Sequence, residues 1–415
     1  MISISQQAER ARRATRALRT LGRSEKDRAL LLIAKNLRDN VGRIAEHNAR
    51  DLEAGQSAGL NGALLDRLRM DAKVTEATAA GVEFIASLAD PVGSRGPMQR
   101  IKGGPLAGRQ RVPLGVIAMI YESRPNVTVD AAALCLKSGN AVLLRGGKEA
   151  SHSNQFLGQL LQQSLLEGGL PSDAIQIIPA TDREGIRELL GLVGLIDLAI
   201  PRGGEGLIRF VAENARVPVI QHYKGVCHLF LDAGCDLEQA VRLSLNGKAQ
   251  RPSACNALEC LLVHAQDAER LLPPVCTALQ RAGVEIRGCG RTQELVPGAS
   301  SASDEDWGRE YLDKVLAVRV VSGIDAALDH IARYGSNHTE AICTESHTHA
   351  QRWLREVDAS CVLVNASTRF NDGGELGLGA EIGISTSKLH AYGPMGLESL
   401  TTEKWVVIGE GQARS

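Results

Sequence analysis

Leu114-Gly-Val-Ile-Ala-Met-Ile120 and Ala141-Val-Leu-Leu144 are two short apolar runs that follow one another along the chain. The segment between them reads as a helix from about Val127 to Lys137, which the turn-forming residues Ser138-Gly139-Asn140 bring to an end. A strand, a helix and a second strand in this order make a βαβ unit, in which the two strands are parallel. Residues 114–144 therefore predict a parallel sheet.

The same alternation continues along the rest of the chain. Further apolar runs separated by helix-like segments lie at 175–178, 196–200 and 217–220, and the pattern restarts after His228. In the second half we expect strands at 228–231, 258–263, 315–320 and 361–364, and helices at 237–245, 266–281, 325–334 and 347–357. Residues 1 to about 90 read as helical. Such alternation is typical of doubly wound α/β domains, and the 415 residues suffice for two of them.

Composition argues against several classes of partner. The formal net charge is -1 and no basic block occurs, so nothing favours binding to nucleic acid. No uninterrupted apolar run reaches the roughly eighteen residues of a membrane span, so no membrane contact is expected. The nine cysteines are scattered without a Cys-x-x-Cys pair, which suggests neither a disulfide framework nor a zinc site. We expect a cytoplasmic protein that holds no metal.

The segment Asn246-Gly-Lys-Ala-Gln-Arg-Pro-Ser-Ala-Cys255 places a cysteine in a polar loop just before an apolar run. Lys248 and Arg251 lie close to it in the sequence. A thiol with the usual pKa of about 8.5 is mostly protonated at neutral pH, and nearby cations favour the reactive thiolate. From the residues alone, Cys255 is either a nucleophile or a small buried hydrophobic side chain.

Two glycine-rich segments follow apolar runs of the first predicted sheet. They are Arg145-Gly-Gly-Lys-Glu149 and Pro201-Arg-Gly-Gly-Glu-Gly206. The usual G-x-G-x-x-G fingerprint is absent, and each segment alone is more typical of a tight turn. Both fall at the same end of one sheet, where open α/β sheets bind ligands, so together they indicate a nucleotide site. Its candidate residues are Arg145, Gly146, Gly147, Lys148, Gly203 and Gly204.

Several motifs carry a resemblance over roughly residues 5–410. The most specific is Val321-x5-Ala327-Leu-Asp-His330-Ile-x2-Tyr334-Gly-Ser-x-His338-Thr-Glu-x-Ile342. Glu122-Ser-Arg-Pro-Asn-Val-Thr, the Cys255 loop and Asn371-Asp-Gly-Gly-Glu-Leu-Gly-Leu-Gly-Ala-Glu-Ile-Gly also match. In these motifs the chain resembles the gamma-glutamyl phosphate reductases, or glutamate-5-semialdehyde dehydrogenases, of the aldehyde dehydrogenase superfamily. The resemblance implies an aldehyde-dehydrogenase-like α/β fold with a small β-hairpin used for oligomerisation.

The resemblance implies the reduction of L-glutamyl 5-phosphate by NADPH to glutamate 5-semialdehyde and phosphate, the second step of proline synthesis from glutamate. Cys255 would attack the acyl carbon and expel phosphate, and hydride transfer to the resulting thioacyl enzyme would give the aldehyde. The oxyanion would be held by the Cys255 backbone N–H and by a side-chain amide, for which Asn126 is our candidate. Capping of a helix explains Asn126 equally well.

Other candidate residues follow from the same resemblance. Glu310 aligns with the carboxylate that holds the nicotinamide ribose in relatives, although a solvated charge at a helix end is the alternative. Arg124, Arg251 and Arg369 are candidates for the substrate's carboxylate and phosphate, because guanidinium pairs bidentately with such groups. In relatives that use NAD, a glutamate near the position of Lys148 binds the adenosine ribose, so the lysine here indicates NADP. For His330 and His338 of the signature we favour a structural role.

Gln221 departs from the aldehyde-oxidising relatives, which carry a glutamate here that activates water. Glutamine cannot act as a base near neutral pH, so the thioester would be spared from hydrolysis. The neighbouring His222 is either a proton carrier near the substrate or a structural histidine. Two other functions stay open: a broad aldehyde dehydrogenase, against which Gln221 argues, and a catalytically silent dinucleotide-binding scaffold, against which Cys255 argues.

The expected domains are consecutive. Residues 1–225 form the cofactor-binding domain and include the hairpin at about 99–112, residues 226–364 form the catalytic domain with the cysteine, and residues 365–415 return to the cofactor-binding domain and end in an oligomerisation strand. The hairpin and this strand suggest a homo-oligomer. The resemblance also implies a functional contact with glutamate 5-kinase, because the acyl phosphate that this kinase makes is unstable.

Overall fold

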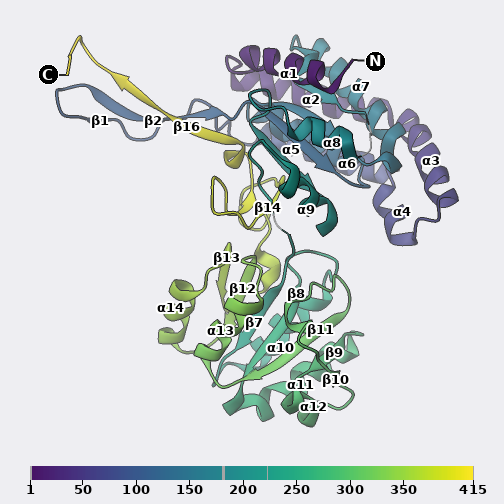
Figure 1. Ribbon diagram of the computed structural model, residues 1–415, viewed down its shortest axis with the longest axis vertical. Coiled ribbons are helices and arrows are strands. Elements are labelled where there is room, and N and C mark those ends of the chain that lie inside the picture. The colour runs from purple at the N-terminus through teal and green to yellow at the C-terminus, as the bar shows by residue number, and fades with distance from the viewer. Residues whose placement is uncertain (1, 180–182, 222, 415) are drawn as a thin grey trace. The chain divides into compact units, whose positions relative to one another are not determined.

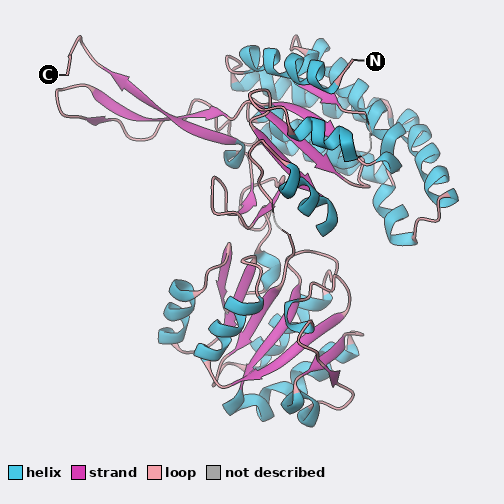
Figure 2. Ribbon diagram, in the orientation of Figure 1, coloured by secondary structure: helices cyan, strands magenta, loops and turns pink. Residues whose placement is uncertain are grey.

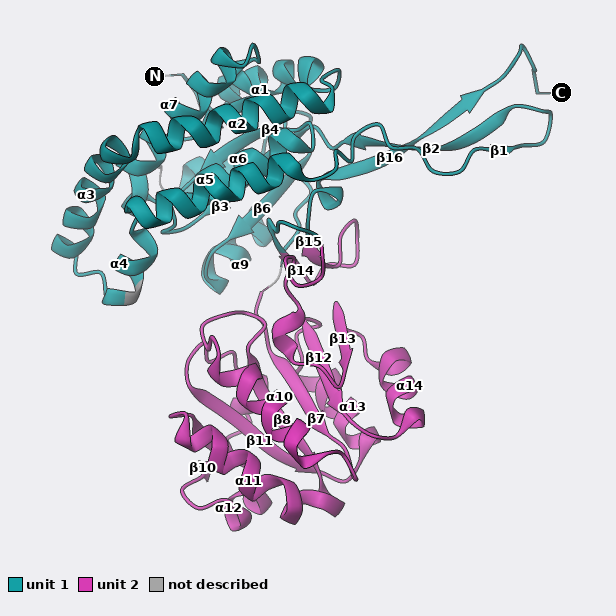
Figure 3. Ribbon diagram, turned by 180° about the vertical axis from the view of Figure 1, so that it is seen from behind, with its two compact units in different colours: residues 1–221, 378–383, 395–415 teal, residues 222–377, 384–394 magenta. Residues whose placement is uncertain are grey.

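A computed structural model describes residues 2–179, 183–221 and 223–414 of the chain. Two compact units are present (Figure 3): unit 1 contains Met1–Gln221, Leu378–Gly383 and Met395–Ser415, and unit 2 contains His222–Gly377 and Ile384–Pro394. Residues 365–377 and 384–394 thus belong with unit 2, whereas the sequence-based division ended this part of the chain at 364. Within the described ranges, no helix combines the length and the apolar character needed to cross a bilayer.

Unit 1 begins with helices, as the spacing of its apolar residues predicts. In the first helix Ala8, Ala11, Ala14 and Leu18 recur on one face and are buried. Ser3 caps this helix, since its side chain accepts a hydrogen bond from the Gln6 backbone N–H. The five N-terminal helices are α1 (Ile4–Leu18), α2 (Arg23–Asp39), α3 (Val41–Ser57), α4 (Gly62–Leu68) and α5 (Ala72–Ser87).

The predicted βαβ unit forms the centre of the unit 1 sheet. Its four parallel strands lie in the order β5-β4-β3-β6. The strands and helices are β3 (Val116–Tyr121), α6 (Asn126–Lys137), β4 (Ala141–Arg145), η1 (Lys148–Ala150), α7 (Ser151–Glu167), η2 (Ser172–Ala174), β5 (Ile175–Ile177), α8 (Arg183–Leu190), β6 (Leu198–Arg202) and α9 (Glu205–Asn214). The expected run at 217–220 adds only an isolated bridge between Val219 and Ala199, because Pro218 has no N–H to extend a ladder.

The order of the strands creates a switch point in this sheet. The chain proceeds from β3 to β4 and β5 on one side and then returns to place β6 on the other side of β3. In open α/β sheets, ligands bind beyond the carboxyl ends of the strands at such a reversal. The loops after Tyr121 and Arg202, at the ends of β3 and β6, therefore flank a natural binding site.

A separate antiparallel sheet projects from the α/β part of unit 1 (Figure 1). It has the order β1-β2-β16 and consists of β1 (Gln99–Arg100), β2 (Leu106–Pro113) and β16 (Thr401–Ile408), the last preceded by η6 (Glu398–Leu400). The C-terminal strand thus pairs with the hairpin of its own chain, from Thr401 opposite Pro113 to Ile408 opposite Leu106. Along β16 the side chains of Trp405, Val407 and Ile408 are exposed.

Unit 2 contains a parallel sheet of seven strands in the order β10-β9-β11-β8-β7-β12-β13, with helices packed along it (Figure 2). Its elements are β7 (Cys227–Leu231), α10 (Leu237–Ala249), β8 (Leu258–His264), η3 (Ala265–Asp267), α11 (Ala268–Arg281), β9 (Glu285–Gly288), α12 (Gly290–Leu295), β10 (Ser300–Ser301), η4 (Asp306–Gly308), β11 (Val315–Val321), α13 (Ile324–Tyr334), β12 (Thr339–Cys343), α14 (His347–Glu356), β13 (Cys361–Val364) and η5 (Thr368–Phe370). A separate two-stranded sheet pairs β14 (Gly383–Ser385) with β15 (Gly393–Met395).

Successive residues of the central strands point into two different cores of unit 2. Leu229 and Leu231 of β7 pack with α10 and α11, whereas Phe230 packs with α13 and with Trp353 of α14. This alternation is the two-residue period of a strand buried on both faces. The strands β9, β10 and β12 and the helix α12 were not expected from the sequence.

Candidate active site

Cys255 lies in the loop between α10 and β8, at the amino end of β8, with a half-buried side chain. Two turns shape the loop: the Ala254 N–H donates to the Arg251 carbonyl, and the Ala257 N–H donates to the Ala254 carbonyl. The buried Asn256 side chain donates to the backbone carbonyl of Asn371, 2.9 Å away, and fixes the residue after the cysteine. The loop thus holds Cys255 at the edge of the sheet.

Gly225 and Glu310 pack against the backbone of this loop. A Cβ on Gly225 would lie 2.1 Å from the Cys255 carbonyl oxygen and 3.1 Å from Oε1 of Glu310. The same carbonyl accepts a hydrogen bond from the thiol of Cys227, with a sulfur–oxygen distance of 3.3 Å. Only a residue without a side chain can therefore stand at 225. The structure places Glu310, predicted for the cofactor, next to the cysteine loop of the same unit.

Two of the three predicted substrate arginines, Arg251 and Arg369, interact electrostatically with each other, and Arg369 also interacts with Cys255. The pKa of Arg369 is lowered by burial and then by the positive charge of Arg251, whereas Asp372 and Cys255 raise it. Arg251 is exposed, and Nε of Arg369 donates to Oε1 of Gln250, 2.9 Å away. The charges of these three side chains therefore influence one another, and the two guanidinium groups suit an anionic ligand.

Lys248, which was expected to support the thiolate, forms an ion pair with Glu259 instead. It is fully buried, and its Nζ lies 2.6 Å from Oε2 of Glu259, which is also fully buried. Burial lowers the pKa of Lys248 and raises that of Glu259 to about 7, while each partner's charge opposes the shift of the other. We regard them as one buried ion pair, in which the lysine charge is already compensated. The expectation that Lys248 supports the thiolate is therefore corrected.

Four of the predicted cofactor residues of unit 1, Arg145 to Lys148, lie at the carboxyl end of β4. A Cβ on Gly146 would lie 2.1 Å from Nδ2 of Asn154, and one on Gly147 would lie 2.1 Å from Oε1 of Glu149. Both obstructing atoms belong to side chains, so a substitution here would have to displace Asn154 or Glu149. Arg145 is nearly buried, and burial lowers its pKa, whereas Glu149 and then Glu122 raise it. Lys148 stands exposed in η1, where its ammonium can reach a ligand.

Gly203 and Gly204 follow β6, and Gly204 is the N-cap of α9. Oε2 of Glu122, the residue after β3, accepts a hydrogen bond from the Gly204 N–H at 2.8 Å. A carboxylate thus sits at the helix N-terminus, on the switch point of the sheet, where a phosphate of a nucleotide would be favoured. Glu122 was not singled out from the sequence, although its position directly after the first strand could have indicated it.

The remaining predicted residues are placed as follows. Asn126 is the first residue of α6, whose N-cap is Pro125, so the capping explanation for its side chain does not hold. Its Nδ2 donates instead to Oδ2 of Asp130, 3.0 Å away. Arg124 is exposed in the preceding loop, and Gln221 is the last residue of the first segment of unit 1. His222 lies outside the described residues.

Asp130 gives a pH-dependent prediction. Burial raises its pKa from 3.8 to about 6, although the hydrogen bond from Asn126 and the charge of Arg202 oppose this. The folded protein thus keeps a proton that the unfolded chain releases, and stability falls as pH rises from about 4 to 6. Because the side chain keeps some exposure, we expect Asp130→Asn to raise the free energy of unfolding by about 1–2 kcal/mol at pH 7.5 and little at pH 4. Urea denaturation at both pH values measures this, and an equal gain at both would contradict it.

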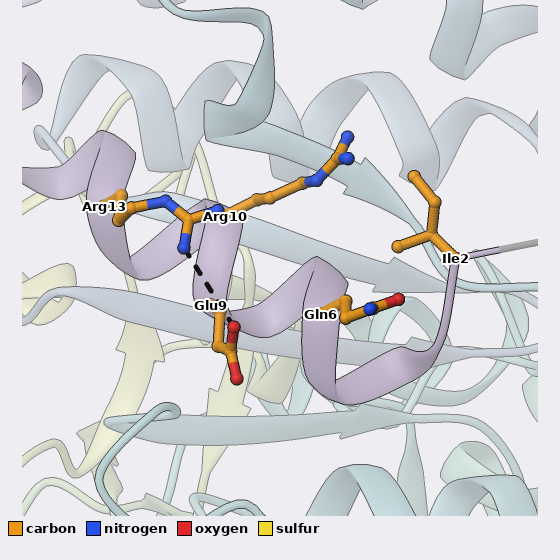
Figure 4. Close-up of a pocket in the computed structure, with 5 residues that line it drawn as sticks. All are labelled: Ile2, Gln6, Glu9, Arg10 and Arg13. Carbon is orange, nitrogen blue, oxygen red and sulfur yellow. Dashed lines mark ion pairs between the residues drawn. The ribbon is translucent and has the colours of Figure 1, made fainter.

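A surface pocket of about 540 Å³ lies along α1 and is lined by Ile2, Gln6, Glu9, Arg10 and Arg13 (Figure 4). All of these residues come from the start of the chain, and Arg13 pairs with Glu9 at 4.0 Å. Binding sites for small molecules usually combine polar groups from several elements around an apolar lining. None of the predicted site residues lines this pocket, and we do not assign it to the active site.

Comparison with known proteins agrees with these observations. The aldehyde dehydrogenase family model matches residues 3–292. A gamma-glutamyl phosphate reductase of Sorangium cellulosum is 64% identical over 98% of this chain and 96% of its own length. The crystal structure of gamma-glutamyl phosphate reductase from Thermotoga maritima superposes with a TM-score of 0.97 at 44% identity, covering 99% of both chains.

A more distant match concerns the fold alone. An engineered glycolyl-CoA reductase with bound NADP+ has a TM-score of 0.68 at 14% identity, over 98% of this chain and 96% of its own. The predicted α/β fold of aldehyde dehydrogenase type is thus confirmed. The chain belongs to the aldehyde dehydrogenase family, in its branch of gamma-glutamyl phosphate reductases.

Proposed function

We propose that the protein reduces L-glutamyl 5-phosphate to L-glutamate 5-semialdehyde and phosphate with NADPH, as the second step of proline synthesis from glutamate. The observation that carries this proposal is the half-buried Cys255 in a loop fixed by the Asn256–Asn371 hydrogen bond. Arg251 lies in the same loop, and Arg369 donates a hydrogen bond to the preceding Gln250. An acyl phosphate with a free carboxylate brings anionic groups to the nucleophile, and guanidinium groups suit both. The names of the relatives at high identity support the same substrate.

In the forward reaction the Cys255 thiolate attacks the acyl carbon, and the C–O bond to phosphate breaks, which leaves a thioacyl enzyme. Arg251 and Arg369 would hold the negative charges of the substrate and of the departing phosphate. The Cys255 backbone N–H and the Asn126 amide are our candidates for the oxyanion that forms at the acyl oxygen. Asp130, bonded to Asn126, would orient that amide. The nicotinamide cofactor, when bound, supplies the hydride.

The binding of a dinucleotide fits the residues of unit 1. A Cβ at Gly146 or Gly147 would have to displace the Asn154 or the Glu149 side chain, and the N-terminus of α9 after β6 already attracts the Glu122 carboxylate. Both features lie at the carboxyl edge of the sheet. Gly203 and Gly204 would approach the phosphates, and Glu310 of unit 2 would hold the nicotinamide ribose.

Lys148→Ala is expected to weaken NADPH binding about tenfold to a hundredfold and to leave NADH nearly unchanged, because a charge-assisted hydrogen bond to the 2′-phosphate is lost. Lys148 is exposed on the loop after β4, next to the nearly buried Arg145. Fluorescence titration with both cofactors measures the effect. The matched control is Lys73→Ala, an exposed lysine of α5 in the same unit. Equal losses for both cofactors, or a loss as large in the control, would remove Lys148 from the cofactor site.

Gln221 provides the test of the reaction. Run backwards with glutamate semialdehyde and NADP, the enzyme is expected to require phosphate strictly, because no carboxylate at position 221 activates water against the thioester. The reduction of NADP is followed with and without phosphate, and free glutamate is assayed in parallel. Formation of free glutamate without phosphate would identify a broad aldehyde dehydrogenase instead.

We further propose a homo-oligomer that forms through the β1-β2-β16 sheet. Its edge strand β16 exposes the apolar side chains of Trp405, Val407 and Ile408 to solvent. A cluster of apolar side chains on an edge strand favours association with another chain. A functional contact with glutamate 5-kinase would protect the unstable acyl phosphate. A cytoplasmic location agrees with the cysteines, since no disulfide joins any of the nine, all of which lie in the described ranges.

A further inference from the structure

His330 and Glu340 of the signature motif take no part in the proposed reaction, yet both are buried in unit 2. They meet His228 of β7 and Cys260 of β8 on the face of the sheet that α13 covers. His228 and Cys260 are fully buried, and His330 is 4% exposed. Two imidazoles and a thiol deep inside a domain need a physical explanation, because buried polar groups are costly unless they are satisfied.

The geometry of the three side chains is close to that of a metal site. One nitrogen of each histidine and the Cys260 sulfur all lie within 4.8 Å of one another. The Cys260 sulfur and Nε2 of His330 are 3.6 Å apart. Two such ligands of a tetrahedral zinc ion, with bonds of about 2.3 Å to sulfur and 2.0 Å to nitrogen, stand roughly 3.5 Å apart. Small movements of the side chains would therefore enclose an ion.

His228 is oriented as metal-binding histidines usually are. Its Nδ1 lies 2.8 Å from Oε2 of Glu340, a carboxylate that is itself fully buried. Its Nε2 is buried and has no hydrogen-bond partner among the described residues. Zinc-binding histidines commonly have this arrangement, with a carboxylate on one imidazole nitrogen and the other nitrogen directed at the metal.

We propose that His228, Cys260 and His330 form a binding site for a thiophilic divalent cation such as Zn²⁺, with Glu340 orienting His228. Imidazole and thiolate are the ligands that zinc prefers over harder cations. On binding, the cation replaces the proton of the Cys260 thiol and the proton that His228 and Glu340 share. Two protons leave as two positive charges enter, so the net buried charge does not change. The proposal is independent of the proposed reaction.

Arg319 opposes the cation. Its guanidinium donates to Nδ1 of His330, 2.9 Å away. A neutral imidazole bound to a cation through Nε2 carries its proton on Nδ1, and a protonated Nδ1 cannot accept this bond. Arg319 must therefore turn away before His330 can become a ligand. A glutamine at this position could instead accept a hydrogen bond from the protonated Nδ1 and support the ligand.

The test uses Co²⁺ as a spectroscopic probe and Zn²⁺ in competition with it. The background is Cys255→Ser, so that the proposed nucleophile cannot bind the ions. We expect Co²⁺ to produce a near-ultraviolet thiolate-to-cobalt absorption that Zn²⁺ abolishes. Adding Cys260→Ala should remove this absorption. Adding Cys276→Ala, at another fully buried cysteine of unit 2, should leave it intact and controls for the loss of a core thiol.

A second variant keeps the proposal testable if Cys260→Ala does not fold. In the same background, Arg319→Gln should bind Zn²⁺ about tenfold to a hundredfold more tightly, the usual size of an effect on a group bonded to a ligand. The affinity is measured by competition with a chromogenic chelator. The proposal is overturned if the Cys255→Ser protein shows no thiolate–cobalt absorption, if the absorption survives Cys260→Ala, or if Arg319→Gln does not tighten binding.

Discussion

Cys255→Ser is expected to retain less than about 1% of the reductase activity while its affinity for NADPH stays the same. A serine hydroxyl stays protonated at neutral pH, so the acyl group cannot be transferred to the side chain. The substitution is small and leaves the contacts that the backbone makes, including the hydrogen bond from Cys227 to the carbonyl of residue 255. Steady-state rates and a cofactor titration on the same preparation separate chemistry from binding.

Cys289 provides the matched control for this substitution. Burial would raise the pKa of its thiol, but hydrogen bonds from Thr292 and from backbone N–H groups, including that of Val320, lower it overall. It is partly exposed, so an alkylating reagent is expected to label both Cys289 and Cys255. Cys289→Ser should keep full activity, and peptide mapping should link inactivation to Cys255 alone. Activity of a few per cent or more in Cys255→Ser would show that the nucleophile is misassigned.

Gly225→Ala is expected to lower kcat/KM about a hundredfold, because the new Cβ would lie 2.1 Å from the Cys255 carbonyl oxygen. No flexible side chain can absorb this overlap, since the obstructing atom belongs to the backbone. The cysteine loop must shift, and a displacement of about 1 Å of a catalytic group can reduce the rate by two orders of magnitude. The Cys227 hydrogen bond to the same carbonyl would be strained as well.

The control for Gly225→Ala is Gly290→Ala in α12 of the same unit. A Cβ at Gly290 would meet no atom within 4 Å, so this change should be almost without effect on activity. Thermal unfolding of both variants shows whether a loss of activity accompanies a general loss of stability. Normal kinetics for Gly225→Ala would mean that the cysteine loop adapts freely and that its fixed position is not needed.

The alternation of apolar runs was enough to predict the parallel sheets, because strands buried on both faces are almost entirely apolar. The same criterion failed for β12, because this strand is buried without being entirely apolar. Its sequence, Thr339-Glu-Ala-Ile-Cys343, contains a glutamate that reads as exposed, but Glu340 is buried against His228 from the neighbouring strand. A compensating partner 112 positions away along the chain cannot be recognised from local pattern.

Residues of the site were predicted where the chain itself brings them together. Arg251 and Cys255 share one loop, and Gly146 and Gly147 share one turn, so their proximity could be expected. Lys248 shows the limit of this reasoning. It is seven positions before Cys255 in the sequence, but it lies on α10, whose geometry turns it towards Glu259 of β8. Arg369, far away in the sequence, donates a hydrogen bond to Gln250 at the start of the cysteine loop and interacts electrostatically with Cys255.

The pairing of β16 with β2 has a consequence for how the chain folds. Leu106 lies opposite Ile408, so just over three hundred residues, including all of unit 2, separate these partners in the sequence. Contacts of such long range form slowly, and during synthesis the early parts of a chain fold first. While the ribosome is still making unit 2, one edge of β2 has no strand to pair with. In the growing chain this edge is a candidate for chaperone binding or misassociation until the last residues emerge.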